Sequence, residues 1–169
     1  MTATVRRVTE DDWALLRRVR LEMLADTPQA YLETVADAEA RTEGEWRFRA
    51  QRVATGSTDL ALAVEDPALP GRWVGYLACF LDAPGQGHVV SVYLAATHRG
   101  TGLAERMLDA VVAWARAEAR LTRLHLYVHE DNHRAAAFYR RYGFTPTGGS
   151  FPYDLDPSKA ELEMALLLG

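Results

Sequence analysis

The spacing of apolar residues changes along the N-terminal third of the chain. The run Thr4–Val8 predicts a short strand, and residues 9–12 then supply a hydroxyl and three acids, which favour the start of a helix. The next apolar residues recur every three or four positions, as in an amphipathic helix: Trp13, Leu16, Val19 and Met23. A second helical stretch is expected over Leu32–Arg52, with an interruption near Gly44.

Strands are expected next, because helical spacing gives way to alternating or continuous apolar runs. Leu60–Val64 and Trp73–Leu81 are separated by a turn that contains proline and glycine, and the turn Pro84–Gly87 precedes a β-branched run at His88–Leu94. Since the connections are short, these three strands are expected to form an antiparallel meander.

The C-terminal half predicts two helices that alternate with strands. Leu103 begins a long amphipathic helix, and Leu124–Val128 alternates as a strand should. A helix over Asn132–Tyr142 is ended by Gly143 at the position of a left-handed cap. The last two strands are expected from Phe144 onward and over Leu162–Leu168.

This order of elements, β-α-α-β-β-β-α-β-α-β-β, predicts a mixed α+β sheet flanked by helices. No repeat, linker or low-complexity tract marks a boundary, so residues 1–169 are expected to form one domain.

The composition narrows the class of protein. The chain of 169 residues has a formal net charge of −4, which argues against a dedicated nucleic-acid binder, and no apolar run is long enough to span a bilayer. The N-terminus lacks the apolar segment of a secretory signal, and Cys79 is the single cysteine. We therefore expect a reduced, cytoplasmic setting, with neither nucleic acid nor membrane as a partner.

The segment most informative about chemistry runs from a strand end into the helix at Leu103. Gly100 and Gly102 let the main chain approach a ligand closely, and a helix start presents unpaired N–H groups that favour a phosphate. The competing interpretation is a connection that only turns the chain. A P-loop is excluded because no lysine lies nearby, and a dinucleotide fingerprint because Glu105 occupies the position of its third glycine.

Two segments resemble the motifs of one family. Residues 99–104, Arg-Gly-Thr-Gly-Leu-Ala, follow a Val-x-Leu strand end and resemble motif A of the GNAT superfamily of acetyl-CoA-dependent N-acetyltransferases. Residues 126–144 look like motif B of the same superfamily, in which an Asn opens a helix, an Ala follows three positions on, and Tyr-x-x-x-Gly-Phe closes it. The motifs have the family's order and usual separation, and the resemblance covers nearly the whole chain.

The resemblance implies how acetyl-CoA is bound. Two parallel strands, ending near Leu94 and Val128, would splay apart to admit the thioester. The strand end would pair with the pantetheine arm through Val92, Tyr93 and Leu94. Backbone N–H groups would hold the pyrophosphate along the loop of motif A: Arg99, Gly100, Thr101, Gly102, Leu103 and Ala104.

The resemblance also assigns chemical roles. The N–H of Leu94 would polarise the acetyl carbonyl, Asn132 would contact the pantetheine or diphosphate, and Tyr139 would act as general acid toward the leaving thiolate. Asn132 as a plain helix cap and Tyr139 as a core aromatic residue are the competing interpretations.

The general base is not assigned by the resemblance. Many relatives have a Glu on the strand before motif A, whereas residues 88–93 contain no carboxylate. His88 is the titratable candidate on that strand, and a solvent-facing histidine is the competing interpretation. A water relay to Glu22, Glu33 or the loop Asp154–Asp156 is equally open.

No metal site is expected. His125, His129 and His133 recur every fourth residue, but a strand-to-helix boundary falls among them, so they do not share a helical face. Cys79 lies in an apolar run and is expected in the core rather than as a nucleophile.

The predicted activity is direct transfer of an acetyl group from acetyl-CoA to a primary amine, in a monomer or homodimer. A small acceptor such as an amino acid, polyamine or aminoglycoside leads, and a protein N-terminus or lysine side chain is the alternative. A non-catalytic acyl-CoA-binding regulatory domain is the alternative of another class, since fold does not determine function.

Overall fold

The structure, a computed structural model, describes residues 2–169. Its strands are β1 (Thr4–Arg7), β2 (Asp59–Glu65), β3 (Trp73–Ala83), β4 (Gln86–Leu94), β5 (Arg123–His129), β6 (Thr145–Tyr153) and β7 (Asp156–Leu167). Its α-helices are α1 (Trp13–Asp26), α2 (Val35–Glu39), α3 (Glu43–Ala54), α4 (Leu103–Ala117) and α5 (His133–Tyr142). Short 3-10 helices occupy Glu10–Asp12, Pro28–Ala30 and Ala96–His98.

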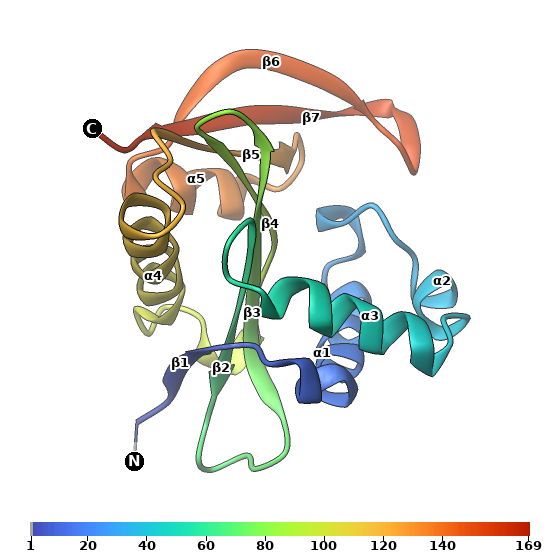
Figure 1. Cartoon of the computed structure of the whole chain (residues 1–169). Helices are drawn as coiled ribbons and strands as arrows, with labels where there is room; N and C mark the ends of the chain where they lie inside the picture. The colour runs from blue at the N-terminus through green and yellow to red at the C-terminus, as the bar shows by residue number, and fades with distance from the viewer. Residues whose placement is uncertain (1) are drawn as a thin grey trace.

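One sheet runs through the molecule, and helices cover both of its faces. Its strand order is β1-β2-β3-β4-β5-β7-β6, with β4 and β5 parallel and the other neighbours antiparallel. Figure 1 shows α4 and α5 on one face and α1, α2 and α3 on the other. The predicted mixed α+β sheet and the antiparallel meander of β2, β3 and β4 are thus confirmed.

The two helix-covered faces bury the apolar positions that the sequence pattern indicated. The apolar stripe of α4 is buried along its length, through Leu103, Met107, Val111 and Trp114. On the other face, Leu16, Val19 and Met23 of α1 are buried as well. Because each helix buries one continuous face, the spacing of apolar residues was a reliable guide to these elements.

The predicted helical stretch 32–52 is confirmed with its interruption, although the break lies just before Gly44 rather than at it. Two helices, α2 and α3, occupy it, and each begins at a threonine that forms a capping box. Oγ1 of Thr42 accepts a hydrogen bond from the Glu45 N–H, and the Glu45 carboxylate accepts one from the Thr42 N–H. The break therefore precedes Gly44, which lies inside the first turn of α3.

The last strand also begins earlier than predicted. β7 starts at Asp156 rather than Leu162, because its polar first half pairs with β6, including Phe151 opposite Glu161. Backbone pairing between two strands needs no apolar side chains, so the apolar pattern indicated only the second half of β7.

Strand β4 separates from β5 halfway along its length. The two strands pair only through residues 86–88 of β4, among the residues described. Beyond that point β4 has a bulge in which Ser91 and Val92 face the single residue Leu77 of β3, and Ser91 has a φ of 57°. The bulge bends β4, and a gap opens between the parallel strands.

Candidate active site

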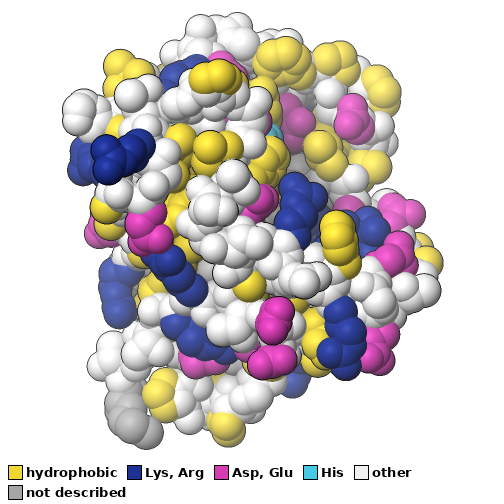
Figure 2. Space-filling model, viewed as in Figure 1, with side chains coloured by type: hydrophobic (Ala, Val, Ile, Leu, Met, Phe, Trp, Pro, Cys, Tyr) yellow, Lys and Arg dark blue, Asp and Glu magenta, His cyan; other side chains and the backbone are white. Residues whose placement is uncertain are grey.

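Two cavities meet at the gap between β4 and β5. The loop-side cavity, of about 270 Å³, is bordered by the loop before α4. The strand-side cavity, of about 210 Å³, is bordered by β4, β5 and β7. Residues that line both cavities are Ala30, Tyr31, Val92, Asn132, Ala135 and Tyr139. Figure 2 shows a hollow between the β6–β7 side of the molecule and the helices α1 to α3.

The loop before α4 presents a row of free N–H groups to the loop-side cavity. Gly100 and Gly102 have φ values of 75° and 82°, in the left-handed region that favours glycine. Within residues 2–169, no hydrogen bond uses the backbone N–H of residues 100–104, whereas the Arg99 N–H donates to the Ala96 carbonyl. A Cβ built on Gly100 or Gly102 meets nothing within 4 Å, so the space in front of the loop is open.

The predicted loop residues divide into two groups. Arg99, Gly100, Gly102 and Ala104 line the loop-side cavity, whereas Thr101 and Leu103 do not. The side chain of Arg99 makes two contacts: Nε donates to the Leu94 carbonyl at 2.9 Å, and Nη2 pairs with Asp26. It therefore holds the end of β4 against the loop.

The free edge of β4 faces the gap. The Ala95 N–H donates to the Val74 carbonyl of β3, and backbone groups alternate along a strand, so the N–H of Leu94 points away from β3. The same alternation directs Val92 toward the gap, where its carbonyl accepts a hydrogen bond from the Tyr31 hydroxyl at 3.0 Å. The N–H groups of Val92 and Leu94 are therefore available to a ligand that lies along this edge.

Asn132 and Tyr139 lie where the two cavities meet. Oδ1 of Asn132 accepts a hydrogen bond from the Ala135 N–H at 3.3 Å, so Asn132 caps α5 while lining both cavities. Tyr139 is buried, and burial raises its pKa well above the ordinary value of 10.0. Its hydroxyl makes no hydrogen bond to residues 2–169 and stays protonated, as a donor must.

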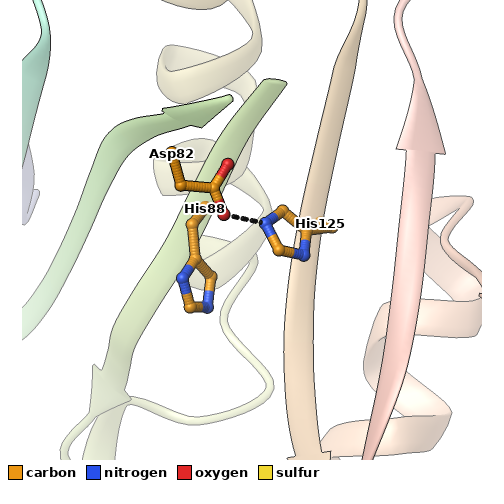
Figure 3. Close-up of side chains that lie close together, drawn as sticks. All are labelled: Asp82, His88 and His125. Carbon is orange, nitrogen blue, oxygen red and sulfur yellow. Dashed lines mark hydrogen bonds and ion pairs between the residues drawn. The ribbon is translucent and has the colours of Figure 1, made fainter. Parts of the chain in front are cut away.

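His88 lines the strand-side cavity and is half-buried rather than solvent-facing. Its ring stacks on that of His125 with centroids 4.6 Å apart. The close-up in Figure 3 shows Asp82 on the same side of His125 as His88, and Oδ2 of Asp82 lies 2.6 Å from Nε2 of His125. Burial and the neighbouring His125 lower the pKa of His88 to about 4, so at neutral pH this imidazole is uncharged and can accept a proton.

Asp82, His88 and His125 are close enough to surround one ion, with candidate ligand atoms within 4.8 Å of one another. Their arrangement suits hydrogen bonds instead. His125 contacts carboxylate oxygens through both ring nitrogens, Asp82 at Nε2 and Glu163 at Nδ1, and a carboxylate accepts but does not donate. The rings of His88 and His125 stack and do not converge on a common point.

Two polar residues of the strand-side cavity were not predicted to lie at the site: Glu161, and His129, which was considered only as a metal ligand. Glu161 pairs with His129 across β7 and β5, and burial, followed by the nearby Asp154, raises its pKa above the ordinary value. Nδ1 of His129 accepts the Asp131 N–H at 3.1 Å, so its proton is on Nε2 when the ring is neutral. The alternation of Glu161 with Glu163 could have indicated a strand face.

Three of the carboxylates predicted for a water relay, Glu22, Glu33 and Asp156, have partners elsewhere. Glu22 pairs with Arg18 and Arg72. Burial acts to raise the pKa of Glu33, but hydrogen bonds from Arg20 and Arg41 outweigh it, and the pKa lies below its ordinary value. Hydrogen bonds with Ser158 lower the pKa of Asp156 as well. Anions stabilised in this way are poor bases. Glu161, whose pKa is raised, is the stronger candidate, and His88 lines the same cavity but is a weakened base because its pKa is lowered.

Cys79 and the histidine series behave as the sequence pattern indicated. Cys79 is buried, and burial raises its pKa to about 12, so it remains a thiol of the core. His125 and His129 lie on β5, whereas His133 begins α5, so the three do not share a helical face.

The parallel strands β4 and β5 part beside a loop that presents free N–H groups. This arrangement is typical of proteins that bind a phosphate-bearing ligand. A model described as the Acetyltransferase (GNAT) family matches residues 20–144. The chain therefore belongs to the GNAT family of acetyltransferases, which use acetyl-CoA, and this confirms the family predicted from the two motifs.

Known proteins agree with this membership. The chain is 31% identical over 150 residues to a mycothiol acetyltransferase of Salinispora tropica, a match that covers 86% of this chain and 44% of the relative. The chain thus spans less than half the length of that relative.

Solved structures share the fold. A GNAT acetyltransferase from Streptococcus pneumoniae has a TM-score of 0.79 at 19% identity, covering 99% of this chain and all of its own. A spermidine N-acetyltransferase from Vibrio cholerae, in complex with CoA and spermine, has a TM-score of 0.73 at 15% identity, covering 98% of this chain and 95% of its own. In residues 2–169, no helix is long and apolar enough to cross a membrane.

Proposed function

We propose that this chain, acting as one domain, transfers an acetyl group from acetyl-CoA directly to the primary amine of a small molecule. The observation that carries the proposal is the pair of cavities that meet at Asn132 and Tyr139. Direct transfer needs two substrates that enter separately and meet at one point. The two cavities offer separate entrances, and their junction offers the meeting point. The names of the mycothiol and spermidine acetyltransferases favour a small acceptor.

The loop-side cavity is the proposed site of acetyl-CoA. The free N–H groups of residues 100–104 supply several donors and the positive end of α4 to the pyrophosphate. The open space before Gly100 and Gly102 leaves room for it. The N–H groups of Val92 and Leu94 then pair with the pantetheine arm as a neighbouring strand would.

The proposed chemistry uses three groups: an oxyanion donor, a base and a donor to the leaving thiolate. The N–H of Leu94 stabilises the oxyanion that forms when the neutral amine attacks the acetyl carbonyl, and a donor of this kind contributes about 2.7–4 kcal/mol. His88 or Glu161, both in the strand-side cavity, takes the proton of the amine. Tyr139 donates to the thiolate sulfur as the C–S bond breaks. Its raised pKa favours a hydrogen bond over complete transfer of its proton.

The test is a coenzyme A release assay over amines and peptides, with Tyr139→Phe as the variant. We expect release with small amines and a kcat about 100-fold lower in the variant, with unchanged acetyl-CoA affinity by calorimetry. Tyr142→Phe is the control, because this tyrosine is on the same helix, hydrogen-bonds Asp109 and lines neither cavity.

The other outcomes separate the alternatives. Unchanged turnover in Tyr139→Phe would remove the role assigned to this residue. Release with peptides alone would favour a protein acceptor. Tight acetyl-CoA binding without release for any acceptor would favour a regulatory domain.

A further inference from the structure

A third cavity lies between helix α3 and the sheet. This helix-side cavity has a volume of about 220 Å³, and its walls come from α1, α3, β2, β3 and β4. It shares Arg20, Val90 and Ser91 with the strand-side cavity, so the two cavities are neighbours at the bulge of β4.

Three polar groups at the helix-side cavity have hydrogen-bonding capacity that residues 2–169 do not use. The indole N–H of Trp46 is fully buried and has no partner among them. The ion pair that Arg49 makes with Glu33 is 3.8 Å long, beyond hydrogen-bonding distance. Burial raises the pKa of Tyr76 to about 12, and its hydroxyl keeps its proton. The Trp46 indole N–H has no accessible surface, so the donors open to a ligand in this cavity are the Arg49 guanidinium and the Tyr76 hydroxyl.

The charges around this cavity leave a positive surplus. The charged residues of its lining are Arg20, Arg49, Arg52 and Asp59. Glu33, which contacts Arg20 and Arg49, adds a second negative charge. Arg41 and Glu45 continue the network away from the cavity and cancel one another. The three arginines and two carboxylates therefore leave a net charge of one positive unit, although each arginine has an ion-pair partner.

Arg49 is at the centre of this surplus. Its spacing from Trp46 places it beside the sheet-facing side of α3, where it lines the helix-side cavity while its side chain stays 37% exposed. Burial lowers its pKa, as do Arg41 and Arg20, against the opposing effect of Glu33. A guanidinium keeps its proton in proteins, and Arg49 lies over the Trp46 ring at 5.4 Å and 3.8 Å from Glu33, so an added anion would find it charged and within reach of the cavity. Figure 2 shows Lys or Arg side chains at the rim of the hollow beside α1 to α3.

We propose that the helix-side cavity binds a carboxylate of the acceptor, so that the acceptor is a primary amine that also carries an acid group, as an amino acid does. The proposal rests on the proposed acetyl transfer, whose amine lies in the neighbouring strand-side cavity. A monoanion matches the single surplus charge, and carboxylate oxygens suit a guanidinium fork and a phenol O–H. A polyamine is disfavoured because its cations would meet like charges.

Arg20 connects this subsite to the gap between the strands. Its Nε donates to Glu33 at 2.8 Å and its Nη1 donates to Oγ of Ser91 at 2.9 Å. Ser91 is the left-handed residue of the bulge that bends β4, a conformation rare outside glycine. A carboxylate beside Arg20 and Arg49 therefore lies next to the segment at which β4 leaves β5.

The first test compares amino acids with their amides as acceptors of the full chain, in the coenzyme A release assay. The amide keeps the side chain but loses the negative charge, and its less basic amine is more often neutral. A preference for the acid therefore reports recognition of charge. We expect kcat/KM to be about 10- to 100-fold higher for the acid.

Substitutions in α3 test whether Arg49 causes the preference for the acid over the amide. Arg49→Gln is expected to remove it, and Arg49→Lys to retain part of it. Arg47→Gln is the control, because Arg47 is exposed on the same helix and pairs with Glu43. Equal kcat/KM values for acid and amide in the unaltered chain, or an undiminished preference in Arg49→Gln, overturn the proposal.

The second test needs no turnover. The indole N–H resonance of Trp46, assigned by its loss in Trp46→Phe, is followed by NMR during titration with isovalerate or isovaleramide. We expect the acid to shift this resonance, the amide to leave it in place, and Arg49→Gln to abolish the shift. A shift without acetylation of any acceptor would leave the subsite standing and reject the proposed function. Acetylation without a shift would reject the subsite alone.

Discussion

Replacing Gly102 by alanine separates the stability of the loop from its ability to bind acetyl-CoA. Gly102 has a φ of 82°, where an L-residue costs about 1–2 kcal/mol. A methyl group at this position meets nothing within 4 Å, so steric overlap adds no further cost. The free energy of unfolding is therefore expected to fall by that backbone cost alone, and Tm by about 2–4 °C for each kcal/mol.

The effect of the same methyl group on binding is expected to be larger. It enters the open space before the free N–H groups of residues 100–104, where the pyrophosphate is proposed to lie. A hydrogen bond to a charged group contributes about 1.5–3 kcal/mol. Loss of one such bond weakens acetyl-CoA binding about 10- to 100-fold.

Gly71→Ala is the matched control for this prediction. Gly71 has a φ of 74°, its Cβ position is equally open, and it lies in the turn between β2 and β3, away from the three cavities. Thermal unfolding is expected to show similar losses in both variants, and calorimetry to show weaker acetyl-CoA binding in Gly102→Ala alone. Equal affinities in the two variants would refute the assignment of the loop.

Two further predictions concern protons. In the unaltered chain, kcat/KM is expected to rise as pH passes through the raised pKa of Glu161, since only the ionised carboxylate accepts a proton. Glu161→Gln is expected to lower kcat/KM and to remove this rise. An unchanged pH profile in the variant would assign the base to His88. Because the folded pKa of His88 is about 4 against an ordinary 6.5, the unfolded chain binds more protons between these values, and stability falls as pH drops through them. His88→Gln is expected to remove about 2 kcal/mol of that fall, allowing for partial exposure, in urea unfolding at both ends of the range; an identical fall in the variant would contradict the lowered pKa.

The fold could be predicted from the sequence because most elements bury one regular face. The helices that begin at Trp13 and Leu103 each bury an unbroken apolar stripe, and β2 to β4 alternate or are wholly apolar. The predicted boundaries differ from the structure where helix capping or backbone pairing determines the end of an element. Threonine caps divide residues 32–52 into two helices, and the polar half of β7 forms by pairing with β6. Neither effect appears in a hydrophobic pattern.

The candidate site was predictable only where a ligand contacts the main chain. Backbone N–H groups need glycine and a helix start, which are local features, so the loop around Gly102 was visible in the sequence. The acceptor side depends on residues far apart in the chain, such as His88 and Glu161, which only the sheet brings to one cavity. Arg49 combines a local sequence feature with contacts that only the fold creates. An arginine three positions after an apolar tryptophan is visible in the sequence, but its meaning depends on how many carboxylates the other strands and helices bring near it.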